Sequence, residues 1–175
     1  KHITVLGIFV ADTSYRAERP PRMGETILGN SFALGPGGKG SNQAVAVGRL
    51  GGDVTILTRL GDDDFADMAE KIWTESNVKS AALRDGNSYT GAAYIFVEEA
   101  SGDNAIIVCP GAANLITPAD MDHNADLIRQ SSVFMTQLEQ PVPTAHRALQ
   151  IARQAGVTTI LNPAPAAELD DDIFT

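Results

Sequence analysis

A glycine-rich stretch at positions 35–44, GPGGKGSNQA, brings together residues that are well suited to bind a ligand. Glycines allow backbone conformations with positive φ and let the main chain approach a bound molecule closely. A helical pattern follows directly, and the first turn of a helix presents unpaired N–H groups. Lys39 and Asn42 add a cation and an amide at the same place. A turn that serves only folding needs one or two glycines, so the pattern predicts a binding loop.

Two nucleotide-binding motifs fit this loop incompletely. The spacing Gly35-x-Gly37-x-x-Gly40 matches the dinucleotide-binding fingerprint, but that motif follows the first strand of a βαβ unit, which here is predicted at residues 3–9. A phosphate-binding P-loop requires glycine where Ala33 stands. A dinucleotide-binding enzyme is therefore kept only as an alternative. Backbone N–H groups, an ammonium and a carboxamide suit a small polar ligand better, and a sugar fits that description.

Two carboxylates are candidates for the same site. Asp12 follows the apolar run at 3–9, and open α/β sheets bind ligands at the carboxyl ends of their strands. A carboxylate there can accept hydrogen bonds from two hydroxyl groups, although a turn or cap residue is the simpler structural role. Glu139 ends a second predicted strand at 133–138, where an isolated glutamate is usually a surface residue. Asp12 counts as a ligand contact only if it shares a cavity with the lysine and amide of the loop.

The elements that must position these residues alternate between strand and helix patterns. We expect strands at 3–9, 54–60, 133–138 and 157–161, and helices at 40–50, 63–76 and 144–155, with a further helix opened by Thr117-Pro118. The helix at 40–50 should bury Ala44, Val45, Val47 and Leu50. This alternation predicts an α/β fold with a parallel sheet and flanking helices.

Two regions break the alternation. Residues 26–34 alternate between apolar and polar types, and residues 89–97 pair with 105–109 across a turn. Because no helices intervene, we expect a small antiparallel sheet that is separate from the main one.

A series of short motifs, in this order, resembles the ribokinase-like (PfkB) carbohydrate kinases. The first is the binding loop, Gly37-Gly38-Lys39-Gly40-x-Asn42-Gln43-Ala44. The others are Ala11-Asp12, Gly24-Glu25-Thr26, Gly61-Asp62-Asp63, Thr90-Gly91, Gln137-Leu138-Glu139 and Asn162-Pro163-Ala164-Pro165-Ala166. Any one of them could arise by chance, whereas their joint order and spacing extend over nearly the whole chain.

The resemblance implies a role for each polar residue of the site. Asp12, Lys39 and Asn42 would contact sugar hydroxyls, and Gly38 would offer its backbone N–H group. Glu139 would lie near the sugar and the region of phosphate transfer.

The resemblance also implies a lid. Segments at about 13–34 and 89–109 would cover the sugar, with Ala93, Ile95 and Val108 facing it. Ordinary sheet packing would select the same residue types. The lid would also form the contact of a homodimer.

The implied activity is ATP-dependent phosphorylation of the primary hydroxyl of a pentose, D-ribose in the first place. Residues 1–175 would correspond to the N-terminal, sugar-binding part, with the catalytic aspartate and the nucleotide pocket expected beyond Thr175. The full-length enzyme would use ATP, Mg²⁺ and a monovalent cation. The chain alone is expected to be inactive and to bind none of these cofactors.

One departure bears on the substrate. Members of the family commonly carry Asn two residues before the aspartate, where this chain has Val10. The loss of that polar contact admits a related pentose, a deoxy-sugar or another polyol. A non-catalytic sugar-binding or dimerising module is the second alternative function.

The composition excludes several other classes. The net charge of −9 without any basic run argues against nucleic acid and anionic membranes as partners. No stretch approaches the ~20 apolar residues of a membrane span. Cys109 is the only cysteine, so no internal disulfide can form and a cytoplasmic location is expected.

Overall fold

A five-stranded parallel sheet forms the main body of the chain. The computed structural model describes residues 1–174. The strands lie in the order β5-β4-β1-β8-β9. Their bounds are β1 (His2–Leu6), β4 (Asp53–Leu60), β5 (Val78–Arg84), β8 (Val133–Thr136) and β9 (Thr158–Leu161), and every neighbouring pair is parallel. Successive residues of a strand point to opposite faces, and Val5 and Leu6 in central β1 are both fully buried. Both faces of this sheet are therefore covered, as parallel sheets require.

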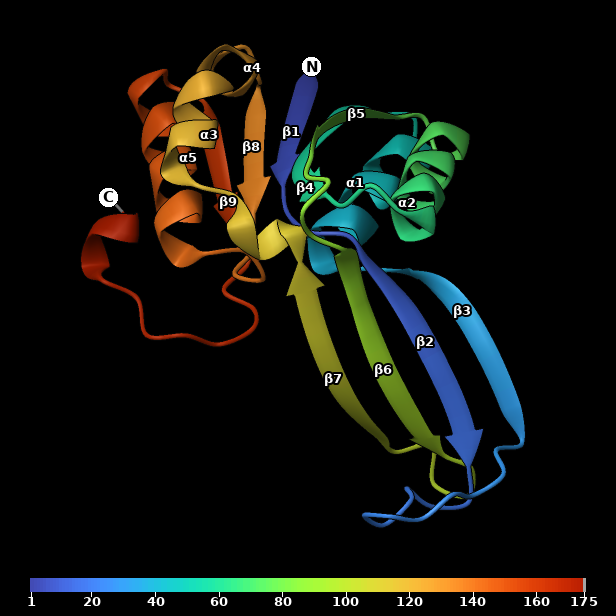
Figure 1. Ribbon diagram of the computed structural model, residues 1–175. Helices are drawn as coiled ribbons and strands as arrows, with labels where there is room; N and C mark the ends of the chain where they lie inside the picture. Colours follow the sequence, from blue (N-terminus) through green and yellow to red (C-terminus); the bar gives the residue numbers. More distant parts are fainter. Residues whose placement is uncertain (175) are drawn as a thin grey trace.

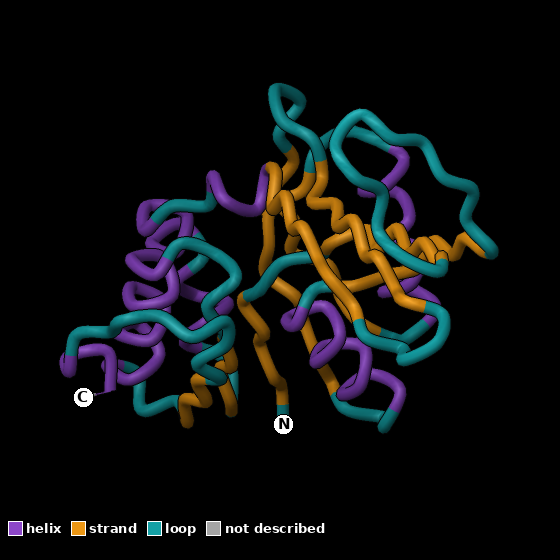
Figure 2. Tube along the Cα trace, turned by 90° about the horizontal axis from the view of Figure 1, so that it is seen from below, coloured by secondary structure: helices purple, strands orange, loops and turns teal. Residues whose placement is uncertain are grey.

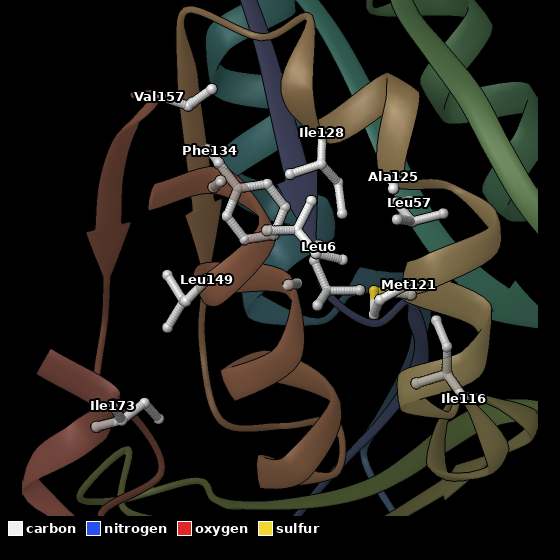
Figure 3. Packing of buried hydrophobic residues seen from close by; sticks show 13 residues of the cluster. Leu6, Leu57, Ile116, Met121, Ala125, Ile128, Phe134, Leu149, Val157 and Ile173 are labelled. Atoms are coloured by element: carbon white, nitrogen blue, oxygen red, sulfur yellow. The ribbon is translucent and has the colours of Figure 1, made fainter. Parts of the chain in front are cut away.

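Helices cover the two faces of the body sheet in separate groups (Figure 1, Figure 2). One face carries α1 (Lys39–Arg49) and α2 (Asp64–Glu75), and the other carries α3 (Pro118–His123), α4 (Ala125–Arg129) and α5 (Val142–Gln154). Each group forms its own apolar layer with the sheet. Figure 3 shows the layer in which Leu6, Phe134 and Leu149 gather. The predicted α/β fold with a parallel sheet and flanking helices is confirmed.

Local signals in the sequence explain where two of these helices begin. Thr117 and Asp120 form a capping box, with Pro118 at the first helical position of α3. Asp63 caps α2, because its side chain accepts a hydrogen bond from the backbone N–H of Ala66.

A second sheet projects away from the body (Figure 1) and is called the lid here. Its strands lie in the order β3-β2-β6-β7. Their bounds are β2 (Val10–Ala17), β3 (Ser31–Gly37), β6 (Thr90–Glu98) and β7 (Asn104–Gly111). The predicted antiparallel pairing is confirmed for β6–β7, and β2 and β3 are antiparallel as well. The central pair, β2–β6, is parallel, because both strands leave the body in the same direction.

The predicted first strand, residues 3–9, is two elements. β1 ends at Leu6, residues 7–9 connect the sheets, and β2 begins at Val10 as a strand of the lid. The run is apolar throughout because the connection itself is buried, with Ile8 and Phe9 at most 1% exposed. Asp12 consequently lies within a lid strand and not at the end of a body strand.

Three further details differ from the sequence-based expectation. The strand predicted at 26–34 lies at Ser31–Gly37. Leu50 is 88% exposed, because α1 has ended at Arg49 and the apolar periodicity no longer applies. The edge strand β5 was not predicted, since Val78–Arg84 carries polar residues on its exposed side. No helix within residues 1–174 is long and apolar enough to cross a membrane.

Replacement of a buried aromatic residue tests this packing. Phe134 is fully buried, so Phe134→Ala should lower the free energy of unfolding by about 3–5 kcal/mol through lost burial and the cavity left behind. Urea denaturation followed by circular dichroism would measure the change. Leu50→Ala is the control and should stay within about 0.5 kcal/mol. Equal effects of the two substitutions would contradict the described core.

Candidate functional site

A pocket of about 190 Å³ lies where the base of the lid meets the beginning of α1. Its walls come from the lid strands β2, β6 and β7, from Gly38 and the first turn of α1, and from the loop after β8. The lining residues are Val10, Asp12, Gly38, Lys39, Asn42, Ala93, Ile95, Ile106, Val108 and Glu139. All eight residues predicted for the site are among them. The condition set for Asp12, a cavity shared with Lys39 and Asn42, is met.

The loop before α1 takes a conformation that favours glycine. Gly38 precedes the helix with φ of 89°, in the region that side chains disfavour. A Cβ atom at Gly38 would also overlap the carbonyl oxygen of Ile8. Two residues later, a Cβ atom at Gly40 would lie 2.6 Å from the Cα of Gly7. The start of α1 is therefore pressed against the connection between β1 and β2, which brings Lys39 and Asn42 to the pocket.

An ion pair fixes the lysine of this loop. Lys39 Nζ donates to Glu139 Oε1 at 2.8 Å, and the backbone N–H of Lys39 donates to Glu139 Oε2 at 2.6 Å. The Glu139 side chain is 13% exposed and that of Lys39 is 42% exposed. Both oxygens of Glu139 are thus engaged, so this residue holds the loop in place as well as lining the pocket. It lies past the end of β8 at Thr136, in the loop that follows the strand.

A second negative charge lies close to Glu139. The pKa of Asp12 is raised above its ordinary value, first by burial and second by repulsion from Glu139. Asp12 sits within β2, between Gly35 of β3 and Ala93 of β6. The pocket therefore combines two carboxylates and one ammonium, with Asp12 contributed by the lid and Lys39 and Glu139 by the body.

Apart from Asp12, the wall formed by the lid is apolar. Ala93 pairs with Val108, and Ile95 with Ile106, so that side chains of β6 and β7 share one face. Ile106 was missed in the sequence analysis, although its position two residues before Val108 places it on the same face. Val10 was considered only as a departure from a family pattern, and it also lines the pocket. A pocket that combines polar groups with apolar side chains suits a ligand that carries hydroxyl groups on a carbon skeleton.

Buried amides support the loop after β8. Gln137 is fully buried, and its Nε2 donates to Gln43 Oε1 of α1. The backbone N–H of Leu138 donates to the carbonyl oxygen of Ala164 at 3.0 Å. These contacts connect α1 and the segment after β9 to the loop that carries Glu139. In the sequence, only the order of two motifs, Gln137-Leu138-Glu139 and Asn162–Ala166, indicated that these segments belong together. The hydrogen bonds between them could not be predicted.

Two neighbouring cavities differ in their chemistry. One of about 310 Å³ shares Lys39, Val108 and Glu139 with the site and extends to Pro165. Another of about 450 Å³ lies at the start of α2, where Ala92 faces away from Ala93 across β6. Neither has the converging carboxylate, ammonium and amide of the smaller pocket, so we place the site there. Among residues 1–174, no group of three or more His, Cys, Asp or Glu could hold a metal ion.

The dinucleotide interpretation lacks its structural context. The fingerprint needs a strand of the parallel sheet before the glycines. In the structure, Gly35 and Gly37 lie within β3, an edge strand of the lid that pairs with β2, and Gly40 already belongs to α1.

Comparison with known proteins gives the family. The pfkB family carbohydrate kinase model matches residues 1–174. The chain belongs to the pfkB family of carbohydrate kinases. Its recognition from motif order in the sequence is confirmed.

Among the relatives, the chain is 39% identical to a bifunctional ribokinase/ribose-5-phosphate isomerase A of Fructilactobacillus sanfranciscensis, over 99% of the chain and 32% of that protein. It is 34% identical to a deoxyribokinase of Salmonella typhi, over 96% of the chain and 55% of that protein. The structure of Arabidopsis thaliana ribokinase complexed with ribose and ATP is similar with a TM-score of 0.87 at 25% identity, covering 98% of the chain and 56% of that protein. The chain thus spans at most about half the length of these relatives.

The charge arrangement of the site predicts a cost in stability. Because the folded-state pKa of Asp12 is raised, ionising this carboxyl costs more in the folded protein than in the unfolded chain. The penalty is present above both pKa values and disappears as the pH falls below the ordinary value of about 4. Asp12→Asn should therefore raise the free energy of unfolding at neutral pH, by roughly 0.5 kcal/mol after solvent screening.

The gain should shrink as the pH is lowered, which thermal unfolding at several pH values would measure. Asp62→Asn removes the same charge from an exposed position and serves as the control. An Asp12→Asn variant less stable than the original protein at neutral pH would contradict this reading of the site.

Proposed function

We propose that the protein phosphorylates the primary hydroxyl of a pentose with ATP, D-ribose being the first candidate, and that this chain supplies the sugar-binding part. The observation that carries the proposal is the pocket that Asp12, Lys39 and Asn42 line together with apolar side chains of the lid. The names of the relatives, ribokinase and deoxyribokinase, favour a pentose over other sugars.

Each residue has a chemical part in this proposal. Asp12 accepts hydrogen bonds from sugar hydroxyls, while Asn42 and the backbone N–H of Gly38 provide further polar contacts. Lys39 donates to a hydroxyl and is kept in position by Glu139. The apolar side chains of β6 and β7 pack on the carbon face of the ring and exclude water from the site.

The phosphate donor is assigned from the family. Arabidopsis ribokinase is described with ribose and ATP, and we extend ATP as donor to this protein. In this proposal the nucleotide, Mg²⁺, a monovalent cation and the catalytic aspartate belong to the part of the relatives that has no counterpart in residues 1–175. No residue of this chain is assigned to Mg²⁺ in this proposal.

A second candidate is a non-catalytic module that binds a sugar and dimerises through its lid. The observation in its favour is the apolar surface of the lid, where Phe32 is 58% exposed and Ile107 is 63% exposed. A homodimer through the lid is equally compatible with the kinase and is proposed for both.

An assay of ADP release with the protein at its natural length tests the kinase. D-ribose, 2-deoxy-D-ribose and D-fructose should be compared, since Val10 admits sugars that lack one hydroxyl. Turnover is expected with at least one pentose. Lys39→Met should lower kcat/KM for it by about tenfold to a hundredfold, the value of a hydrogen bond to a charged group.

Lys71→Met provides the control for Lys39→Met, because the Lys71 side chain is 75% exposed on α2. Binding of a pentose without any ADP release would favour the non-catalytic module. No binding and no turnover with all three sugars would rule out both candidates.

A further inference from the structure

Two of the sequence motifs meet at the root of the lid, outside the pocket. Gly61-Asp62-Asp63 forms the loop between β4 and α2, and Thr90-Gly91 begins β6. Asp63 Oδ2 accepts a hydrogen bond from the backbone N–H of Thr90 at 2.7 Å. Thr90 Oγ1 accepts one from the backbone N–H of Gly61 at 2.9 Å. Each motif therefore accepts a hydrogen bond from a backbone N–H group of the other.

The contact is buried and closely packed. Thr90 is 1% exposed. A Cβ atom at Gly61 would lie 2.6 Å from the carbonyl oxygen of Ser88 and 2.7 Å from the backbone nitrogen of Thr90. Replacing Gly61 by any other residue would thus push the beginning of β6 away from the body.

Asp63 uses its two oxygens for different elements. Oδ1 accepts from the backbone N–H of Ala66 and caps α2, while Oδ2 holds Thr90. Burial acts to raise the pKa of Asp63, but hydrogen bonds from Thr90, Ala66 and Phe65 outweigh it and lower the pKa below its ordinary value. Asp63 is therefore a carboxylate at neutral pH and can accept both N–H groups, which a neutral amide cannot do in the same geometry.

The position of Thr90 determines where the apolar wall of the pocket lies. Ala93 and Ile95 follow three and five residues later in the same strand and line the pocket. A strand advances by about 3.3 Å per residue, so Ala93 lies roughly 10 Å from the anchored residue. Since the strand is continuous, a shift or tilt at Thr90 is passed to the wall.

We propose that Asp63 and Thr90 are positioning residues, which set the height of lid strand β6 over the pocket and thereby the affinity for the sugar. The proposal rests on the proposed function for the identity of the ligand. Neither side chain touches the pocket, so both act through Ala93 and Ile95.

The competing explanation is that Asp63 only caps a helix. Asp63→Asn separates the two roles, because Asn is as good an N-cap as Asp but presents an NH₂ group where Oδ2 accepted from Thr90. Thr90→Val removes the hydroxyl and keeps the shape, whereas Thr90→Ser keeps the hydroxyl. Asp62→Asn, one residue away and exposed, is the matched control for the loss of charge.

The test measures the Kd for D-ribose by titration calorimetry, and the melting temperature, for the protein at its natural length. Asp63→Asn and Thr90→Val should each weaken binding by about tenfold or more, as displacements near 1 Å do in binding sites. Thr90→Ser and Asp62→Asn should stay within twofold of the original protein. Values within twofold for both Asp63→Asn and Thr90→Val, with or without a lower melting temperature, would overturn the proposal.

Hydrogen–deuterium exchange gives a readout that needs no sugar. Asp63→Asn should speed exchange in β6 and β7 and leave β1 unchanged, whereas loss of a helix cap alone would speed exchange in α2. Exchange that rises only in α2 would overturn the positioning role. Lack of ribose binding by the original protein would contradict the proposed function, while this measurement would still decide the position of the lid. If Asp63→Asn does not fold, the pair Thr90→Val and Thr90→Ser carries the same test.

Discussion

The interaction between Glu139 and Lys39 holds the site together. It joins residues that are a hundred positions apart, and it engages both oxygens of the carboxylate with one residue, through its backbone and its side chain. The geometry of this contact strengthens it beyond the attraction between the two charges. The carboxylate also accepts a hydrogen bond from a backbone N–H group, which can move only together with the chain around it. The start of α1 is thereby tied to the loop after β8, and this contact brings Lys39 and Glu139 to the same pocket.

The same interaction explains the electrostatics of Asp12. The pocket holds one ammonium and two carboxylates, and the ammonium of Lys39 already donates to Glu139. Asp12 is therefore left with burial and repulsion, which raise its pKa. A partly buried carboxylate with a raised pKa gains when a ligand supplies hydrogen-bond donors. Hydroxyl groups of a sugar provide such donors without adding charge, so the raised pKa of Asp12 fits the neutral sugar that we propose as the ligand.

The sequence predicts contacts between residues close together in the chain better than contacts between distant ones. Lys39, Asn42 and Gly38 lie within a few residues of one another, so their convergence follows from local chain geometry. Asp12 shares a pocket with Lys39 and Asn42 as expected, but it lies in a different element from the predicted one, since the apolar run at 3–9 hides a change from the body sheet to the lid. Hydrophobic periodicity reports burial, and a buried connection between two sheets reads like one strand. The parallel pairing of β2 with β6 depends on which sheet each strand joins, which local patterns do not encode.

For a related reason, the sequence does not predict hydrogen bonds between the backbone of one motif and a side chain of a distant motif. Asp63 before an apolar helical pattern reads fully as a helix cap, and nothing local shows that its second oxygen has another partner. A cap that also anchors a second element is over-determined, because the helix alone would accept Ser, Thr or Asn at that place. A carboxylate is required there only because the backbone N–H group of Thr90 needs a second acceptor oxygen. At such a position several residue types can fill the local role, but only one type can also make the distant contact. The fold and the site then constrain the same residue.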